Sequence, residues 1–179
     1  MRVYAIRHAD AGNYIGKSQA DEFVHNPADL ARKLMPEGVD MAQNLAQWML
    51  DNDEVPTLIL YSPVQRAAQT AKVMRAALAA GGARVPARVE QNLEISKPWE
   101  MTVKAVAADP SMKRVALVSH SDNMIPGLRA LNYYSGADKF AVDPIAKCEM
   151  RILKVDRGTF NWKERARIMP SDLGSYDAY

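Results

Sequence analysis

The stretch Val3-Tyr4-Ala5-Ile6-Arg7-His8-Ala9-Asp10 decides the fold of this chain. Its first four residues are apolar and include types that favour β-strands, and the run stops abruptly at a charged pair. A short apolar run that is bounded by polar residues is typical of a buried strand. We therefore predict a strand over residues 2–6, and we expect Arg7 and His8 at its end to carry the chemistry.

The composition is that of one ordinary globular domain. The chain has 179 residues, of which 48% are hydrophobic and 25% are charged, so it is long enough to bury one core. Its formal net charge of +2 comes from 23 basic and 21 acidic residues mixed along the sequence, and we expect no nucleic-acid partner. Only residues 157–167 are locally basic, which we interpret as the solvated side of a strand or loop. We expect one domain over residues 1–170 and a C-terminal tail over 171–179.

The sequence predicts a cytoplasmic protein. The single cysteine, Cys148, cannot form an internal disulfide and lies in an alternating apolar run, so we expect it in the core of a protein from a reducing compartment. The N-terminus opens directly into a strand pattern, without the features of a secretory signal. No apolar run approaches the roughly 20 residues that a membrane helix needs, so we expect no membrane partner.

Strand-like and helix-like runs alternate along the chain, which is typical of an α/β domain with a mainly parallel sheet. The irregular, polar segment 9–33 is interpreted as a flap over the site. Ser62 and Pro63 are the predicted N-cap and first residue of a helix. Other predicted helices begin at Pro36 and span 99–109 and 122–131, and predicted strands span 57–61, 87–90, 114–119, and 148–155 with 159–168 as an edge hairpin. The predicted fold class is α/β: a three-layer α/β/α sandwich with a mainly parallel central sheet and an antiparallel edge hairpin near the C-terminus.

Three of these strands end in polar residues. The first ends at Arg7-His8, the second at Ser62 with Arg66 one turn later, and the strand 114–119 at His120. Ligands of open parallel sheets bind beyond the carboxyl ends of the strands, so these side chains are expected to converge there.

A pair of histidines with a pair of arginines suits a phosphate group. Two guanidiniums can hold phosphate oxygens through charge-assisted hydrogen bonds, and a neutral imidazole can attack phosphorus. Nearby guanidiniums favour that neutral form. A metal site is a poor competitor because the histidines lack a closely spaced partner ligand, so we expect no metal and no cofactor. The third histidine, His25, is interpreted as a solvent-exposed residue of the polar segment.

Three motifs resemble those of the histidine phosphatase (phosphoglycerate mutase-like) superfamily. They are Arg7-His8, the stretch 62–71 (Ser-Pro-Val-Gln-Arg-Ala-Ala-Gln-Thr-Ala), and Val118-Ser119-His120. The usual family motifs are Arg-His-Gly, Ser-Pro-x-x-Arg-Ala-x-x-Thr-Ala and Gly-His. The resemblance covers residues 1–155, and the short chain, with Leu34 followed by Gly38, resembles the small branch of SixA-type phosphohistidine phosphatases.

The resemblance implies a role for each matching residue. His8 is the nucleophile that becomes phosphorylated, Arg7 and Arg66 bind the phosphoryl group, and His120 donates a hydrogen bond to it. Ser62 belongs with the phosphate-binding residues. Many family members carry a glutamate that protonates the leaving group, and Glu94 is the first candidate for that role, ahead of Asp10 and Asp122. A solvated loop carboxylate is the competing interpretation of Glu94.

Two residues depart from the family pattern. Ala9 and Ser119 stand where the family usually has glycine, and a side chain there clashes if the backbone needs a positive φ or approaches phosphate closely. Two hypotheses follow. The first is a metal-independent phosphatase that acts on a phosphomonoester or a protein phosphohistidine through a phosphohistidine intermediate on His8. The alternative is a weak or inactive phosphate- or phosphoprotein-binding module on the same fold.

A mutase or bisphosphatase is a third option. It is disfavoured because such enzymes need further basic residues to bind a second phosphate, and the candidates in this sequence are only Lys17, Arg32 and Lys33. The sequence leaves the oligomeric state open.

Overall fold

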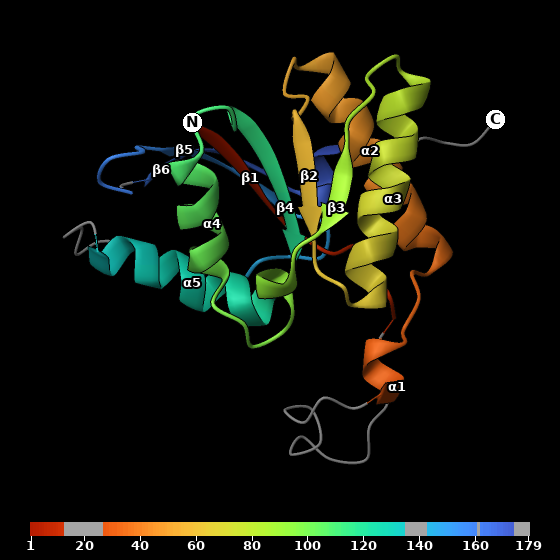
Figure 1. Ribbon diagram of the computed structural model, residues 1–179. Coiled ribbons are helices and arrows are strands. Elements are labelled where there is room, and N and C mark those ends of the chain that lie inside the picture. Colours follow the sequence, from red (N-terminus) through yellow and green to blue (C-terminus); the bar gives the residue numbers. More distant parts are fainter. Residues whose placement is uncertain (13–26, 135–142, 161, 174–179) are drawn as a thin grey trace.

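The N-terminal apolar run forms strand β1 (Arg2–Arg7), in which residues 3–6 are all buried. β1 lies inside a mixed sheet with the strand order β3-β2-β4-β1-β5-β6, and helices cover both faces of that sheet (Figure 1). The computed structural model describes residues 1–12, 27–134, 143–160 and 162–173. Within them, the predicted three-layer α/β/α architecture is confirmed.

The register of the sheet follows from β1. It pairs in parallel with β4, with Ile6 opposite Val118, and antiparallel with β5, with Ile6 opposite Met150. β2 extends the parallel part between β4 and β3, and β6 pairs antiparallel with β5 at the other edge, as the predicted hairpin requires. The other elements are α1 (Pro27–Leu30), α2 (Pro36–Asp51), β2 (Leu58–Tyr61), α3 (Gln65–Ala80), β3 (Ala87–Val89), the 3₁₀ turn η2 (Gln91–Leu93), α4 (Trp99–Ala108), β4 (Arg114–Ser119), α5 (Ser121–Tyr134), β5 (Met150–Val155), β6 (Trp162–Ile168) and the 3₁₀ turn η3 (Pro170–Leu173).

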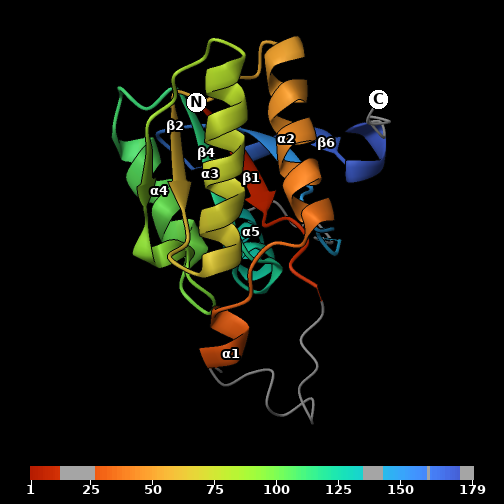
Figure 2. The same ribbon diagram turned by 90° about the vertical axis from the view of Figure 1, so that its right-hand side faces the viewer.

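Alternating side chains of β1 point into two separate hydrophobic cores. Tyr4 and Ile6 pack on the side of α2 and α3, whereas Val3 and Ala5 pack on the side of α4 and α5. The two helix pairs lie on opposite faces of the sheet in both views (Figures 1 and 2). The period of two in a strand therefore supplies both cores from one segment.

Gly38 lets α2 approach the loop that follows β1. A Cβ at this position would lie 2.1 Å from the carbonyl oxygen of Asp10, closer than any side chain tolerates. The Met35 N–H donates to that same carbonyl at 2.9 Å. The glycine thus fixes the start of α2 directly beside the end of β1.

Some predicted boundaries were wrong. Helix α3 begins at Gln65, and its N-cap is Val64 in an extended conformation, so Ser62 and Pro63 are neither N-cap nor first helical residue. The reason is that the Ser62 hydroxyl bonds elsewhere, as described below. Cys148 is buried in the core as predicted, but it occupies a turn with φ of 60° and precedes β5.

The locally basic stretch 157–167 is only partly solvated. Lys163 and Arg165 are exposed on β6, whereas Arg157 donates to the carbonyls of Ala107, Asp109 and Met112 around the end of α4. Within the described part of the chain, no helix is both long and apolar enough to cross a membrane.

Candidate active site

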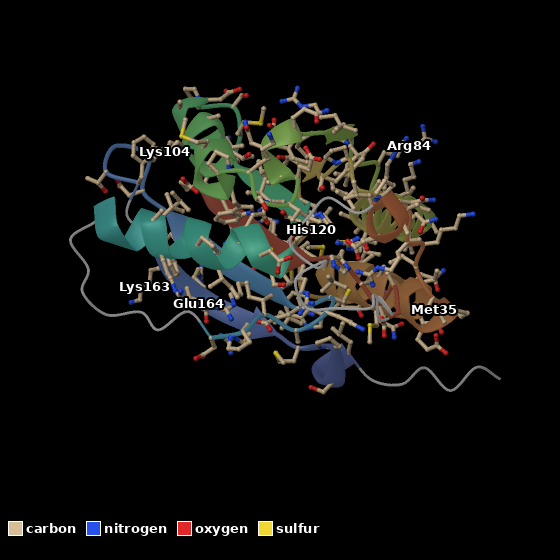
Figure 3. All side chains as sticks on the ribbon, turned by 90° about the horizontal axis from the view of Figure 1, so that it is seen from below. Met35, Arg84, Lys104, His120, Lys163 and Glu164 are labelled. Atoms are coloured by element: carbon tan, nitrogen blue, oxygen red, sulfur yellow. The ribbon has the colours of Figure 1, made fainter. Side chains whose placement is uncertain are left out.

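The ends of three parallel strands are joined by backbone hydrogen bonds that continue the sheet. The His8 N–H donates to the Ser119 carbonyl at 2.9 Å, and the Ser62 N–H donates to the Val118 carbonyl at 3.0 Å. These bonds fix His8, Ser62 and His120 relative to one another. This end of the sheet faces α1 (Figure 1), and in the view from that side His120 lies near the middle (Figure 3).

His8 is a buried, neutral imidazole. Its Nδ1 lies 2.8 Å from the Ala9 carbonyl oxygen, which can only accept, so Nδ1 carries the proton. Nε2 then keeps its lone pair, and it accepts from Arg66 Nε at 3.1 Å. Burial lowers the pKa of His8 to about 3, and the charges of Arg66 and Arg7 act in the same direction. His8 therefore presents an unprotonated nitrogen at neutral pH.

His120 faces His8, and the two ring centroids are 5.2 Å apart. Its Nε2 lies 2.9 Å from Ser62 Oγ, which also accepts from the Val64 N–H at 3.2 Å. Burial holds the pKa of His120 well below its usual value, and His8 and Arg66 lower it further. When the Ser62 hydroxyl donates to Nε2, the proton of the neutral ring sits on Nδ1. That atom is buried and has no partner among the described residues, so it is available to donate.

Arg7 brings one half-buried guanidinium to the site. Arg7 donates through Nη1 to the Ile145 carbonyl at 2.5 Å, and its buried Nε lacks a partner in the described structure. Burial lowers its pKa. The cation is therefore held in place with donor capacity left over.

Arg66 brings the second guanidinium, which is 4% exposed. It donates through Nη1 to the Asp29 carbonyl at 2.9 Å, and its Nη2 lies 3.2 Å from Asp29 Oδ2. Burial lowers the pKa of Arg66 too. Together with Arg7, this brings two guanidiniums to the buried histidines, a set of donors that suits an anion with several acceptor oxygens.

The described part of the predicted flap contacts Arg66. Asp29 of α1 contacts Arg66, and Arg32 pairs with Asp29 at 2.6 Å and donates to the Gly12 carbonyl at 2.6 Å. His25 and Lys17 lie outside the described residues, so their interpretation stays a prediction. Asp29 occupies the Arg66 nitrogens that a phosphate would need.

Neither departure from the family glycines imposes a backbone conflict. Neither Ala9 nor Ser119 has a positive φ. The Ala9 methyl is fully buried in the core on the α2 and α3 side, and the Ala9 N–H donates to Thr70 Oγ1 at 3.0 Å. Ser119 directs its hydroxyl towards Leu93 and Asn123. Both side chains are thus used by the protein in packing or hydrogen bonding.

The three candidate proton donors lie in different surroundings. Glu94 follows η2, is half-buried, and is held through its backbone carbonyl by Asn123 Nδ2 at 2.8 Å. Although burial raises the pKa of Asp10, its bonds to Lys147 and Gly12 outweigh that effect and lower it overall, which is unfavourable for a donor. Asp122 is exposed at the start of α5. Glu94 stays the first candidate, and its role stays a prediction.

Sequence reasoning assigned no role to three residues that hold the site. Thr70 accepts from Ala9 and donates to the Arg66 carbonyl at 2.8 Å, and its place one turn after Arg66 was a visible signal. Asn123, three residues after His120, also fell at helical spacing. Asp29 offered no signal, because its contact with Arg66 joins distant segments. Among the described residues, no three His, Cys, Asp or Glu side chains are grouped so that they could hold a metal ion.

The fold matches known phosphatase structures over nearly the whole chain. A SixA protein histidine phosphatase in complex with tungstate superposes with a TM-score of 0.75 at 18% identity, covering 97% of this chain and all of the other. A protein from Agrobacterium tumefaciens assigned as the phosphohistidine phosphatase SixA gives 0.69 at 22% identity, covering 94% and 97%. A mycobacterial glucosyl-3-phosphoglycerate phosphatase gives 0.66 at 16% identity, covering 92% and 96%. No protein-family model matches the sequence, and neither does any curated protein.

The chain thus has the fold of the histidine phosphatase superfamily, as its motifs predicted. The likeness covers nearly the full length of the SixA structures and of the mycobacterial phosphatase alike. At these identities the likeness establishes the fold, and the activity is argued from the site.

Proposed function

We propose that this protein is a metal-independent phosphatase that works through a phosphohistidine on His8. The observation that carries the proposal is the buried pair of His8 Nε2, which keeps a lone pair, and His120 Nδ1, which has no partner in the described structure. The charges of Arg7 and Arg66 act on both rings, and Arg7 Nε is a further donor without a partner in the described structure. The fold, which is that of known phosphatases, supports the same reaction.

The proposed reaction has two steps. In the first, His8 Nε2 attacks phosphorus as the bond to the leaving oxygen or nitrogen breaks, and Arg66 turns from Nε2 to the phosphoryl oxygens. The Nδ1–H bond to the Ala9 carbonyl holds the ring and stabilises the positive charge that develops on it. In the second, water attacks phosphorus and gives a proton to the Glu94 carboxylate or to a phosphoryl oxygen, while the N–P bond breaks and its electron pair returns to Nε2. Arg7, Arg66 and His120 stabilise the charge on the equatorial oxygens in both steps.

The substrate class is a phosphomonoester or a protein phosphohistidine. An alkoxide leaving group needs a general acid, for which Glu94 is proposed, whereas a leaving imidazole is less basic and needs one less. Inorganic phosphate is a product in either case.

The test is turnover of an aryl phosphate by the wild type and by His8→Ala. We expect the wild type to form an acid-labile, alkali-stable phosphoenzyme and His8→Ala to lose both that species and turnover. Asp53→Ala, at the opposite end of the sheet, is the control and keeps full activity. Equal turnover in wild type and His8→Ala contradicts the proposal. Phosphate binding without any phosphoenzyme would instead support the binding-module alternative.

A further inference from the structure

Two buried side chains at the end of β4 hold the backbone of the segment 91–94. Ser119 Oγ lies 2.8 Å from both the Leu93 carbonyl oxygen and Asn123 Oδ1. Asn123 Nδ2 donates to the Leu93 carbonyl at 3.0 Å and to the Glu94 carbonyl at 2.8 Å. Ser119 is 0% and Asn123 3% exposed, so these bonds form away from water.

The orientation of the Asn123 amide is fixed by its neighbours. Oδ1 faces two donors, the Ser119 hydroxyl and the His120 N–H at 3.4 Å, and Nδ2 faces two carbonyl oxygens. The reversed amide would set donor against donor and acceptor against acceptor. Asn123 therefore bridges the turn that carries His120 to the segment that carries Glu94 in one defined way.

The segment 91–94 has little regular structure of its own, and it is anchored by the fully buried Leu93 side chain and by these bonds. It follows the three-residue edge strand β3, and its own 3₁₀ turn is short. Beyond Asn123, the Glu94 carbonyl accepts only a local bond, from Lys97 N–H at 3.1 Å. A glycine at 119 would remove the hydroxyl, whose single proton is shared between the Leu93 carbonyl and Asn123 Oδ1.

We propose that Ser119 and Asn123 are positioning residues that place Glu94 as the general acid next to His120. This inference rests on the proposed function and deepens it. Glu94 gives its proton to the leaving oxygen as the P–O bond breaks and the bond from His8 Nε2 to phosphorus forms, and it ends the step as a carboxylate. Serine at 119 thus performs a task that the usual glycine cannot.

The inference predicts a selective loss. Alkyl phosphates leave as strongly basic alkoxides and depend on the acid, whereas p-nitrophenolate leaves readily without one. Weakening the support of Glu94 should therefore slow an alkyl phosphate more than an aryl phosphate. A merely structural role would slow both equally.

The experiment measures kcat/KM for p-nitrophenyl phosphate and for ethyl phosphate in Ser119→Gly and Ser119→Ala. We expect the ratio of the two values, aryl over alkyl, to rise roughly tenfold in both variants, a part of the about 10²- to 10⁴-fold that general acid catalysis contributes. Glu94→Gln should raise the ratio further. In the Glu94→Gln background, Ser119→Gly should add nothing. Thr102→Val, which removes a buried hydroxyl of α4, is the control and leaves the ratio unchanged.

Two results overturn the inference. One is an aryl-over-alkyl ratio of kcat/KM that stays unchanged in the Ser119 variants or in Glu94→Gln. The other is a change in that ratio on Ser119→Gly that is equally large in the wild-type and Glu94→Gln backgrounds. With either result, the proposed function still stands if His8→Ala abolishes the turnover of the aryl phosphate. A wild type without that turnover removes the function and the inference together.

Discussion

Two groups of buried charges lie at the end of β1, and they differ in how well their charges are matched. In the first, which we call the Glu149 cluster (Glu149, Arg151 and Arg167), Glu149 Oε1 accepts from Arg151 Nε at 2.9 Å, and Oε2 accepts from the Ala146 N–H at 2.7 Å. Arg167 Nε forms an ion pair with Oε1 at 3.2 Å. In the second, the candidate site, Arg7 Nε and His120 Nδ1 have no partner among the described residues.

The difference separates a structural group from a group that is prepared for a ligand. A buried carboxylate with two cations and a backbone donor is satisfied within the protein. In the candidate site, the half-buried Arg7 cation and the neutral His120 ring each keep one N–H donor without a partner in the described structure, and a bound anion can accept from both. The two groups are also connected, because the Arg7 N–H donates to the Glu149 carbonyl at 3.1 Å and its guanidinium reaches Ile145 of the same segment. The cluster therefore helps to hold the site.

Removing the centre of the Glu149 cluster should have the largest effect. We expect Glu149→Ala to lower the free energy of unfolding by about 3–5 kcal/mol, because it leaves Arg151 buried without its anion. Urea denaturation measures this. Glu164→Ala removes a half-exposed carboxylate 3.7 Å from the same arginine and should cost less than about 1 kcal/mol. Equal losses in the two variants would contradict the difference drawn here.

Replacing Arg7 by methionine should affect mainly activity, whereas the same replacement of Arg151 should affect mainly stability. Arg7→Met should lower kcat/KM for an aryl phosphate by about 10²- to 10³-fold, because a donor to the transition state is lost. Its free energy of unfolding should stay within about 1 kcal/mol of the wild type, since the cation it removes has an unpaired nitrogen. Arg151→Met should instead have its midpoint of unfolding at a clearly lower urea concentration. A large loss of stability in Arg7→Met would place Arg7 with the structural group.

The neutral imidazoles should make stability depend on pH. The unfolded chain binds a proton at His8 below about pH 6.5, while the folded pKa is about 3, so the unfolded state binds more protons in this range. Stability therefore rises with pH and is lost as the pH falls from about 6.5 to about 3. Between pH 7 and 5 the contribution of His8 is on the order of 2 kcal/mol, and His8→Asn should remove it. Urea midpoints in phosphate-free buffers test this, and an identical pH profile in the variant would refute it.

Freeing Arg66 from α1 should have the smallest effect. Asp29→Asn keeps the size of the side chain but removes the charge that competes with phosphate for Arg66. We expect the Kd for inorganic phosphate, measured by calorimetry, to fall by a few-fold, in keeping with about 1 kcal/mol or less for a partly exposed pair. Asp53→Asn, which breaks a pair with Arg114 at the far end of the sheet, is the matched control. A weaker affinity in Asp29→Asn would show that Asp29 supports the pocket.

The secondary structure followed closely from the sequence where patterns are local. The strand 114–119 and the helix that begins at Pro36 were predicted within their observed bounds, because apolar periodicity and a proline at the helix start act over a few residues. The start of α3 was placed two residues too early, with Ser62 as N-cap and Pro63 as first residue, where the cap is Val64 and the helix begins at Gln65. There a contact with His120, 58 residues away, uses the hydroxyl that local reasoning had given to the helix. The domain boundary, the cytoplasmic location and the partners stay predictions.

The sequence by itself determined the order of the elements, the burial of the first strand, and the motif residues His8, Arg66 and His120, since each depends on local patterning. Only the tertiary structure decided the tautomer of His8, the pairing of Asp29 with Arg66, and the direction of the Ser119 side chain. The physical reason is that hydrogen bonds and burial join segments that are far apart in the chain. The sequence therefore does not show what a serine in place of glycine does at position 119, because its effect depends on the groups that its hydroxyl contacts in the folded protein.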